Sequence, residues 1–369
     1  MTARPKPSPD LGLRVGVVGG SIGGLSAACA LVRSGARVHV LERASPCFAE
    51  RGGGLGVDPE LVAQVSGRRG LPCLVLRKRR QWMGGEQSVA DCRLPVTSYG
   101  ALWRWLRRAA DLAAVEFQRD VAFAEHRECV RVTTSDGRAS SFDLLVAADG
   151  GRSAIRTTYF GAQQTYAGYT LWRGLVPLRA VGALRDWGPT LHVAARPAQH
   201  FVAYPITGPD GGLDSDELLL NWGWYCGLSE AELPSVLAKL SGSPHVLTRH
   251  EPSVQALSER WRAQGWPDWV DAIVRATMGH GQIRPHPVYQ SMPSSLGRRR
   301  IALLGDAGHL ASPITGSGAR LAMEDALELA AALERTATVE AAVDDYSRAR
   351  LGRAQQVVRY GEERGMAFR

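Results

Sequence analysis

RVGVVGGSIGGL, residues 14–25, decides the fold: a short β-branched run ends in glycines and leads into an alanine- and leucine-rich segment. The pattern predicts a strand over 14–18, a tight turn, and a helix over 22–34 that Gly35 ends. A second strand is predicted over 37–41, with Glu42 directly after it. A strand–helix–strand unit of this length predicts a parallel sheet covered by helices.

The glycines of this stretch are typical of a dinucleotide site. Gly19 permits the turn out of the strand, and Gly24 lets the helix approach the sheet. The helix N-terminus then offers free N–H groups to a pyrophosphate, and Glu42 lies about where an acid binds a ribose. Ser21 replaces the middle glycine of GxGxxG, and we expect it to cap the helix. The fingerprint leaves open whether a dinucleotide binds at all, because glycine turns also serve packing alone. It also leaves open which dinucleotide would bind, because FAD and NAD share this motif.

Two further segments place an aspartate at the end of a buried strand. The first is LLVAADGGRSAIR, residues 144–156, and the second is IALLGDAGH, residues 301–309, which SPITGSGA (312–319) and MEDA (323–326) follow. Open α/β sheets bind ligands at the carboxyl ends of their strands, where Asp149 and Asp306 fall. The small residues before the next helix can present several N–H groups to an electron-rich ring edge.

The texture of the chain changes near residue 165. Segments 169–176, 200–206 and 218–225 alternate, contain many aromatic residues and are separated by Pro, Gly and Asp, as in an antiparallel sheet. We therefore expect an α/β fold with an α+β insertion. Its predicted parts are a Rossmann-like domain over 1–164, an antiparallel-sheet substrate domain over 165–285, and the completion of the first domain with C-terminal helices over 286–369.

The remaining predicted elements are less regular. Residues 57–97 show little pattern, and Asp136-Gly137 signals a tight turn. Strands are predicted over 130–134, 143–147 and 300–304, and helices over 99–112, 230–278, 318–335 and from Val339 onward.

Composition argues against several classes of function. The net charge is +8, but the arginines are scattered, no aromatic–basic module of a nucleic-acid binder occurs, and the run Arg77–Arg80 is interpreted as a solvated face. The six cysteines form no CxxC pair and have no metal spacing, so reduced thiols and no metal site are expected. No run approaches the ~20 apolar residues of a membrane span, and residues 1–10 lack the apolar core of a signal peptide. We expect a cytoplasmic protein with neither nucleic-acid nor membrane partners.

Taken together, the three motifs resemble those of the flavin-dependent aromatic hydroxylases of the para-hydroxybenzoate hydroxylase type. They match that family's dinucleotide fingerprint, DG motif and GD motif in order, and the likeness covers nearly the whole chain. Within the family, the chain is most similar to a subgroup that acts on hydroxylated pyridines. The strings that carry this likeness are GGSIGGL, TSY (97–99), ADGGRSAIR, TYAGY with WRG (165–174) and HFVAYPI (200–206).

The resemblance implies non-covalently bound FAD, with NAD(P)H as a transient co-substrate. It implies that Glu42 binds the adenosine ribose, that Asp306 binds the ribityl chain, and that Asp149 supports the handling of both FAD and NAD(P)H. Many family members carry, where Tyr99 stands, an arginine that contacts the cofactor; the subgroup shares the tyrosine instead. The implied cofactor-binding residues are Gly19, Ser21, Ile22, Gly24, Glu42, Arg43, Gly54, Tyr99, Val121, Asp149, Asp306, Thr315, Gly316, Ser317, Gly318 and Ala319.

The implied activity is that of a single-component monooxygenase. Reduced flavin would capture O2 as a C4a-hydroperoxide and deliver one oxygen atom to an electron-rich aromatic or N-heteroaromatic ring. Candidate catalytic residues are His309, Pro313, Gly316 and Gly318, where His309 serves either as a structural hydrogen-bonding group or in acid–base chemistry.

Trp172, Phe201, Ala203 and Trp222 are the candidate substrate residues. Alternation places Phe201 and Ala203 on one face of a strand and Tyr204 on the other, and one face should line a flat, apolar pocket over the flavin. The pattern leaves open which face that is.

Other flavin chemistries remain alternatives. A Baeyer–Villiger-type oxygenation, a non-oxygenating oxidase or dehydrogenase, and a flavin-binding regulator without turnover all fit the motifs. Trp222-Gly223-Trp224 resembles an element of the flavin halogenases, but Tyr225-Cys226-Gly227 follows it in place of Ile-Pro, which argues against halogenation. A homodimer is the habit of the resembled family.

Overall fold

The structure is a computed structural model that describes residues 11–43, 53–111, 115–116, 121–125, 128–182, 188–234, 265–280 and 282–369. A six-stranded sheet in the order β16-β17-β10-β1-β2-β6 carries the three sequence motifs. Its neighbouring strands are parallel, except that the edge strand β16 runs antiparallel. The carboxyl ends of β1, β10 and β17 therefore meet at one edge. The strands are β1 (Arg14–Val18), β2 (Arg37–Leu41), β6 (Val115–Glu116), β10 (Leu144–Ala147), β16 (Gly297–Arg298) and β17 (Ile301–Leu303).

Both faces of this sheet are covered, which explains its uninterrupted apolar strands. Side chains of β1 and β10 pack with several helices in the largest hydrophobic cluster. The opposite face packs on a three-stranded sheet of β7 (Val121–Glu125), β8 (Val130–Thr134) and β9 (Ala139–Phe142). The covering helices are α1 (Ile22–Arg33), α2 (Pro59–Ser66), α3 (Tyr99–Ala110), α8 (Gly318–Arg335) and α9 (Val339–Gly365).

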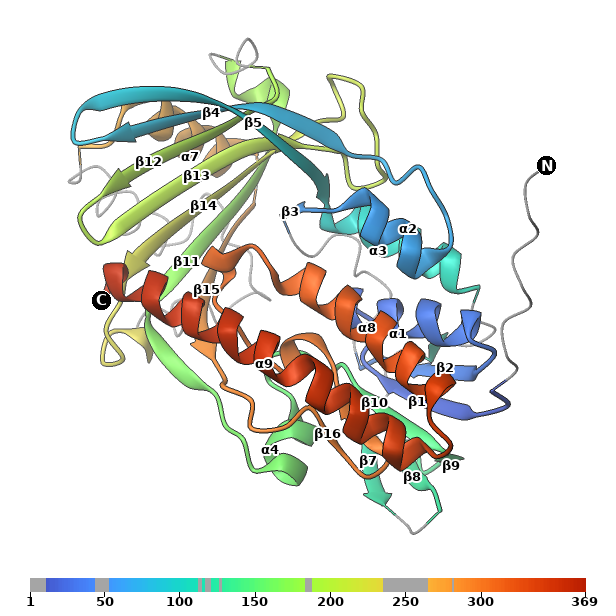
Figure 1. Ribbon diagram of the computed structural model, residues 1–369. Helices are drawn as coiled ribbons and strands as arrows, with labels where there is room; N and C mark the ends of the chain where they lie inside the picture. Colours follow the sequence, from blue (N-terminus) through green and yellow to red (C-terminus); the bar gives the residue numbers. More distant parts are fainter. Residues whose placement is uncertain are drawn as a thin grey trace.

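An eight-stranded sheet forms the second layer, in the order β15-β11-β14-β13-β12-β4-β5-β3 (Figure 1). It is antiparallel apart from the β12–β4 pair. One of its faces packs on α7 (Asp268–His280). The strands are β3 (Gly54–Gly56), β4 (Leu74–Met83), β5 (Glu86–Ser98), β11 (Thr165–Pro177), β12 (Thr190–Arg196), β13 (Gln199–Ile206), β14 (Leu219–Gly227) and β15 (Gln282–Gln290).

Most predicted elements are confirmed, but β4 and β5 were not predicted. Residues 77–79 of β4 and 86–91 of β5 are exposed, so much of this hairpin lacks the apolar alternation that marks a half-buried strand. The hairpin belongs to the same sheet as β11–β15, so the antiparallel sheet is not confined to residues 165–285. The division into 1–164, 165–285 and 286–369 stays a prediction.

Short elements connect these layers: α4 (Ala154–Phe160), η2 (Leu178–Ala180), η4 (Gly305–Ala307), η5 (Pro313–Thr315) and η6 (Met366–Phe368). The predicted helical region 230–278 lies largely outside the described residues, and α7 is its described part. Of the described cysteines, Cys29, Cys73, Cys92, Cys129 and Cys226 are all free thiols. No described helix has the length and apolar character needed to cross a membrane.

Candidate active site

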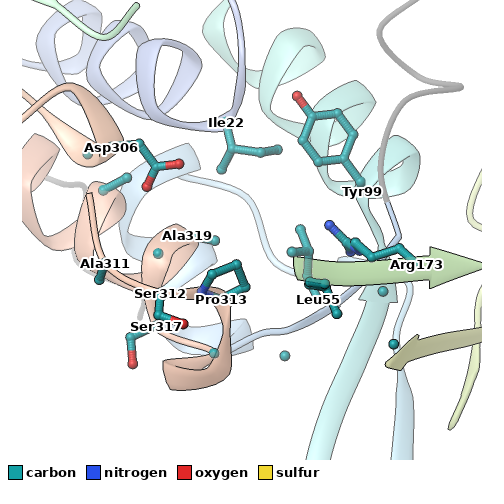
Figure 2. Close-up of a pocket in the computed structure, with 18 of the residues that line it drawn as sticks. Ile22, Leu55, Tyr99, Arg173, Asp306, Ala311, Ser312, Pro313, Ser317 and Ala319 are labelled. Atoms are coloured by element: carbon teal, nitrogen blue, oxygen red, sulfur yellow. The ribbon is translucent and has the colours of Figure 1, made fainter. Parts of the chain in front are cut away.

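A cavity of roughly 380 Å³ lies between the motif-bearing edge of the six-stranded sheet and one face of the eight-stranded sheet. Figure 2 shows Ile22, Asp306 and the loop around Pro313 on one side, with Leu55 and Arg173 on the other. The first side consists of residues from all three sequence motifs. The second consists of residues from β3, β11, β13 and β14. The structure thus brings the predicted cofactor motifs and the predicted substrate sheet to one cavity.

The glycines of the first motif are required by backbone geometry. Gly19 has φ +109°, and a Cβ there would lie 2.2 Å from the Ala148 carbonyl oxygen. A Cβ on Gly24 would lie 1.8 Å from the Gly19 carbonyl oxygen. Because both positions exclude a side chain, α1 starts close to the end of β1 and Ile22 reaches the cavity wall. The predicted roles of Gly19 and Gly24 in the turn and in packing agree with these contacts.

Ser21 does not cap α1 in the way we expected. It occupies the N-cap position, but its side chain makes no capping hydrogen bond. Its hydroxyl instead lies 2.8 Å from the Tyr99 hydroxyl, and both residues line the cavity. The two positions that depart from the resembled pattern are therefore joined in space. The hydroxyl of Tyr99, at the start of α3, competes with the N–H groups of α1 for the Ser21 oxygen. This contact explains why Ser21 does not cap the helix.

Glu42 lies beside the glycine turn, as its position after β2 predicted. Its Oε2 accepts a hydrogen bond from the Gly20 N–H at 2.6 Å, and the side chain is buried. The neighbouring Arg43 is exposed. Neither residue lines the cavity itself, so the ribose-binding role of Glu42 stays a prediction.

Arg156 fastens the DG motif to the GD motif. Its guanidinium donates to the carbonyl oxygens of Gly151, Asp306 and Ala307, and the side chain is 1 % exposed. This arginine ends the string ADGGRSAIR, and its role was not predicted from the sequence. A signal was present: Arg156 comes shortly after the loop at the end of a predicted buried strand, and a guanidinium can satisfy several carbonyl groups at once.

Asp149 follows β10 and Asp306 follows β17, as predicted, but of the two only Asp306 lines the cavity. Asp149 Oδ2 accepts from the Ala154 N–H, while its buried Oδ1 has no partner. No protein hydrogen bond to the Asp306 carboxylate is found in the described part of the chain, and this side chain is open to the cavity. Desolvation by the surrounding protein raises the pKa of the Asp306 carboxyl group, while the charges of His309 and Arg156 oppose that shift. The structure thus leaves an acceptor at the cavity that suits the hydroxyl groups of a bound ligand.

The loop after η4 provides a cradle for a flat ligand. Pro313, Gly316, Ser317, Gly318 and Ala319 line the cavity, whereas Thr315 accepts a hydrogen bond from the Ser317 N–H and lies outside the wall. A Cβ on Gly318 would meet only Asp306 Oδ1, at an ordinary 3.5 Å. Protein packing therefore does not require glycine there, and close approach of a ligand gives a reason for it. The residues present fit an extended dinucleotide cofactor with its ring at this loop.

His309 lies behind the cavity rather than in its wall. It is 1 % exposed, and its Nε2 lies 2.6 Å from Asp325 Oδ2, while Asp325 Oδ1 accepts from Arg350. Burial lowers the pKa of His309, but the charges of Asp325 and Asp306 and the hydrogen bond to Asp325 outweigh burial and raise it. Direct contact between His309 and a substrate is not supported. Its geometry agrees with the structural interpretation, because it ties η4 to α8.

Three of the predicted substrate residues lie on the covered face of the sheet. Trp172, Phe201 and Ala203 pack with residues of α7. Trp222 packs there too, with its Nε1 donating to Thr277 Oγ1 at 2.8 Å, although it also borders the cavity. Leu171, Val202 and Tyr204, from the opposite face, line the cavity instead. Alternation tells which residues share a face but not which face a helix covers, so the sequence left this choice open, and the substrate-binding role of these four residues stays a prediction.

Several cavity residues were missed at the sequence level. They are Leu55, Leu171, Arg173, Val202, Tyr204, Asn221, Tyr225, Ala311 and Ser312. Asn221 Oδ1 accepts from the Gly54 N–H at 2.7 Å, which holds β3 beside β14. Gly54, a predicted cofactor residue, does line the cavity. Val121 begins β7, but its side chain lies outside the described residues.

Comparison with known proteins agrees with this geometry. Residues 251–360 match an FAD binding domain family, residues 166–265 an FAD binding domain-like family, and residues 17–49 an NAD(P)-binding Rossmann-like domain. The chain is 29 % identical to the 3-amino-4-hydroxybenzoate 2-monooxygenase of Streptomyces cremeus, with 95 % of this chain and 86 % of the relative covered. It is 25 % identical to the 2,6-dihydroxypyridine 3-monooxygenase of Paenarthrobacter nicotinovorans, with 86 % and 82 % covered. The similarity to FAD-dependent monooxygenases therefore extends over most of this chain.

Solved structures show the same fold. The 2,6-dihydroxypyridine-3-hydroxylase from Arthrobacter nicotinovorans superimposes with a TM-score of 0.85 at 22 % identity, covering 97 % of this chain and 93 % of the other. Klebsiella pneumoniae HpxO in complex with FAD and uric acid gives a TM-score of 0.75 at 26 % identity, covering 96 % and 89 %. The chain is thus an FAD-dependent monooxygenase with a para-hydroxybenzoate hydroxylase-like fold. The resemblance seen in the sequence motifs is confirmed.

Proposed function

We propose that this monooxygenase uses NAD(P)H and O2 to hydroxylate an electron-rich aromatic or N-heteroaromatic small molecule. The observation that carries the proposal is that the motif loops and an aromatic and aliphatic sheet wall face each other across one shared cavity. Relatives named for 3-amino-4-hydroxybenzoate and 2,6-dihydroxypyridine support this class of ring. Bound FAD would accept a hydride from NAD(P)H and activate O2, and the proposal includes the C4a-hydroperoxide route that the family resemblance implies.

The proposed work of the protein is binding, orientation and exclusion of water. Glu42 and Asp306 accept hydrogen bonds from cofactor hydroxyl groups, and the start of α8 offers its free N–H groups to the electron-rich edge of the ring system. Leu55, Val202 and Tyr204 hold the substrate ring from the other side and keep water from the reacting atoms. Arg156 acts indirectly: it holds the two loops that carry Asp149 and Asp306 in place and need not contact the cofactor itself.

The test is substrate-stimulated oxidation of NAD(P)H by the FAD-loaded protein. A panel of hydroxylated benzoates, pyridines and purines is screened by O2 uptake, and each product is identified by mass and by NMR. Hydroxylation at a ring carbon supports the proposal, whereas insertion of oxygen next to a carbonyl supports the Baeyer–Villiger alternative. Stimulated NAD(P)H oxidation without an oxygenated product from any compound indicates an oxidase. An absence of stimulated turnover supports a flavin-binding regulator.

A further inference from the structure

Arg173 is the one basic residue among the described residues that line the cavity, and its guanidinium makes no hydrogen bond or ion pair with any other described residue. It stands on β11, half-buried, and Figure 2 shows its side chain directed into the cavity toward the loop of Ser312 and Pro313. A guanidinium that is partly removed from water without a protein partner is costly. Since nothing in the described part of the chain neutralises it, a ligand is the natural partner.

The cross-strand neighbours leave room for such a ligand beside Arg173. Gly223, which pairs directly with Arg173 on β14, also lines the cavity and adds no side chain of its own, with Leu171 and Val202 beside it. Arg284 pairs with it on β15, and directly opposed residues of like charge repel each other across a sheet. The wall is therefore both open and positive at this point.

The ionisable groups around Arg173 do not replace the missing anion. Burial raises the pKa of Tyr204 and of Tyr225, with Arg173 opposing both shifts, so both hydroxyl groups are neutral near pH 7. The cavity's carboxylate, Asp306, is influenced by the charges of His309 and Arg156 instead. Asn221 already accepts the Gly54 N–H through its side-chain oxygen. Neutral donors and one unpaired guanidinium thus surround the same end of the cavity.

We propose that Arg173 binds a negatively charged substituent of the ring substrate, a carboxylate or an ionised ring hydroxyl, and so selects anionic over neutral rings. This inference rests on the proposed function for the identity of the ligand as substrate. A guanidinium can hold a carboxylate through two parallel hydrogen bonds, which fixes the orientation of the ring as well as its affinity. The end of the ring away from Arg173 then faces the loop of Pro313 and Gly318.

The test measures binding to the FAD-loaded protein without turnover. Flavin absorbance is titrated with 4-hydroxybenzoate, with its neutral partner 4-hydroxybenzamide, and with 2,6-dihydroxypyridine below and above the ionisation of its hydroxyl group. Wild type is compared with Arg173→Gln, Arg173→Lys and the control Arg79→Gln, which removes an exposed arginine from β4 of the same sheet. FAD affinity is measured for every variant.

Wild type should prefer at least one anionic probe over its neutral form. Arg173→Gln should weaken that anion roughly tenfold to a hundredfold and change the neutral form little. The affinity of Arg173→Lys for the anion should lie between those of wild type and Arg173→Gln, because lysine keeps the charge but lacks the planar guanidinium group. Arg79→Gln should match wild type, and FAD affinity should not change. Dependence on Arg173 for the benzoate, the ionised pyridine or both identifies the source of the charge.

Three results would overturn the inference. Wild type could bind no anionic probe more tightly than its neutral partner, Arg173→Gln could weaken both forms equally, or it could weaken FAD, which would assign the arginine to the cofactor. Turnover is scored separately. Anion binding that depends on Arg173 without stimulated NAD(P)H oxidation rejects the proposed function alone, and turnover of neutral rings with no effect of Arg173 rejects this inference alone.

Discussion

A single methyl group at Gly24 would collide with the backbone of the glycine turn, since its carbon would lie 1.8 Å from the Gly19 oxygen. We expect Gly24→Ala to lower the free energy of unfolding by at least about 2–3 kcal/mol, because only backbone movement can remove the clash. Gly352 is the matched control: it lies exposed in α9 and has nothing within 4 Å of an added Cβ. Gly352→Ala should raise stability by about 0.5–1 kcal/mol. Urea unfolding of both variants checks the pair, and similar effects at the two positions would contradict it.

Asp306 is a second position where one side chain should decide binding. Its carboxylate opens on the cavity without a protein hydrogen bond in the described part of the chain, so Asp306→Ala should leave folding nearly unchanged. The loss of charge-assisted hydrogen bonds should weaken FAD by about tenfold to a hundredfold. Glu42→Ala should weaken FAD too, but it should also destabilise the apoprotein, because Glu42 accepts the Gly20 N–H. Fluorescence titration with FAD and urea unfolding separate these effects. Unchanged FAD affinity in both variants would show that the cofactor lies elsewhere.

At the scale of the element, the loop before α8 is where we expect coupling of oxygen activation to hydroxylation to be decided. Gly318→Ala adds a methyl group that the protein itself tolerates, because the nearest atom would be Asp306 Oδ1 at 3.5 Å. Apoprotein stability should therefore hold, while the flavin edge is displaced and the site opens to water. The expected result is more hydrogen peroxide released per NAD(P)H consumed, with FAD saturating. A ratio of hydrogen peroxide to NAD(P)H equal to that of wild type would show that this loop does not control coupling.

The buried network of His309, Asp325 and Arg350 joins η4, α8 and α9, and its stability should depend on pH. The pKa of His309 is raised in the folded protein, so its charge stabilises the fold below the unfolded value of about 6.5. That contribution is lost as pH rises through the folded pKa. The difference in unfolding free energy between wild type and His309→Gln should thus be larger at pH 6 than at pH 9. A difference independent of pH would mean that the imidazole acts only through packing.

At the scale of the whole molecule, FAD should act as a clamp between the two sheets. The cavity takes residues from both sheets and from the loops after β1, β10 and β17. Since FAD binds the folded chain alone, it should raise stability by about 2.7 kcal/mol at a concentration 100 times its Kd. Thermal unfolding with increasing FAD measures this, and the acid-precipitated protein should be colourless because the flavin is not covalently attached. Equal stabilisation by FMN would contradict the expected use of the adenosine half.

The sequence by itself determined the dinucleotide unit and the edge at which the site lies. Gly19, Gly24 and the β-branched run of β1 act through local backbone geometry, so their pattern carries their structure directly. Asp306 was found for the same reason, because a buried strand followed by glycine and an acid is a local signal. The family resemblance added the cofactor, since the order of three motifs is also written along the chain.

Only the tertiary structure decided what lies between these motifs. The β4–β5 hairpin escaped prediction because its exposed strands lack alternation, and His309 was separated from the cavity by its contact with Asp325, sixteen positions away. Ser21 does not cap α1, because its hydroxyl contacts that of Tyr99, 78 positions further along the chain. The face of the sheet that borders the cavity was decided by α7, which covers Trp172 and Phe201 and leaves Arg173 and Tyr204 facing the cavity. A period of two shows which side chains share a face, but the element that covers that face is chosen by long-range packing, which no local pattern encodes.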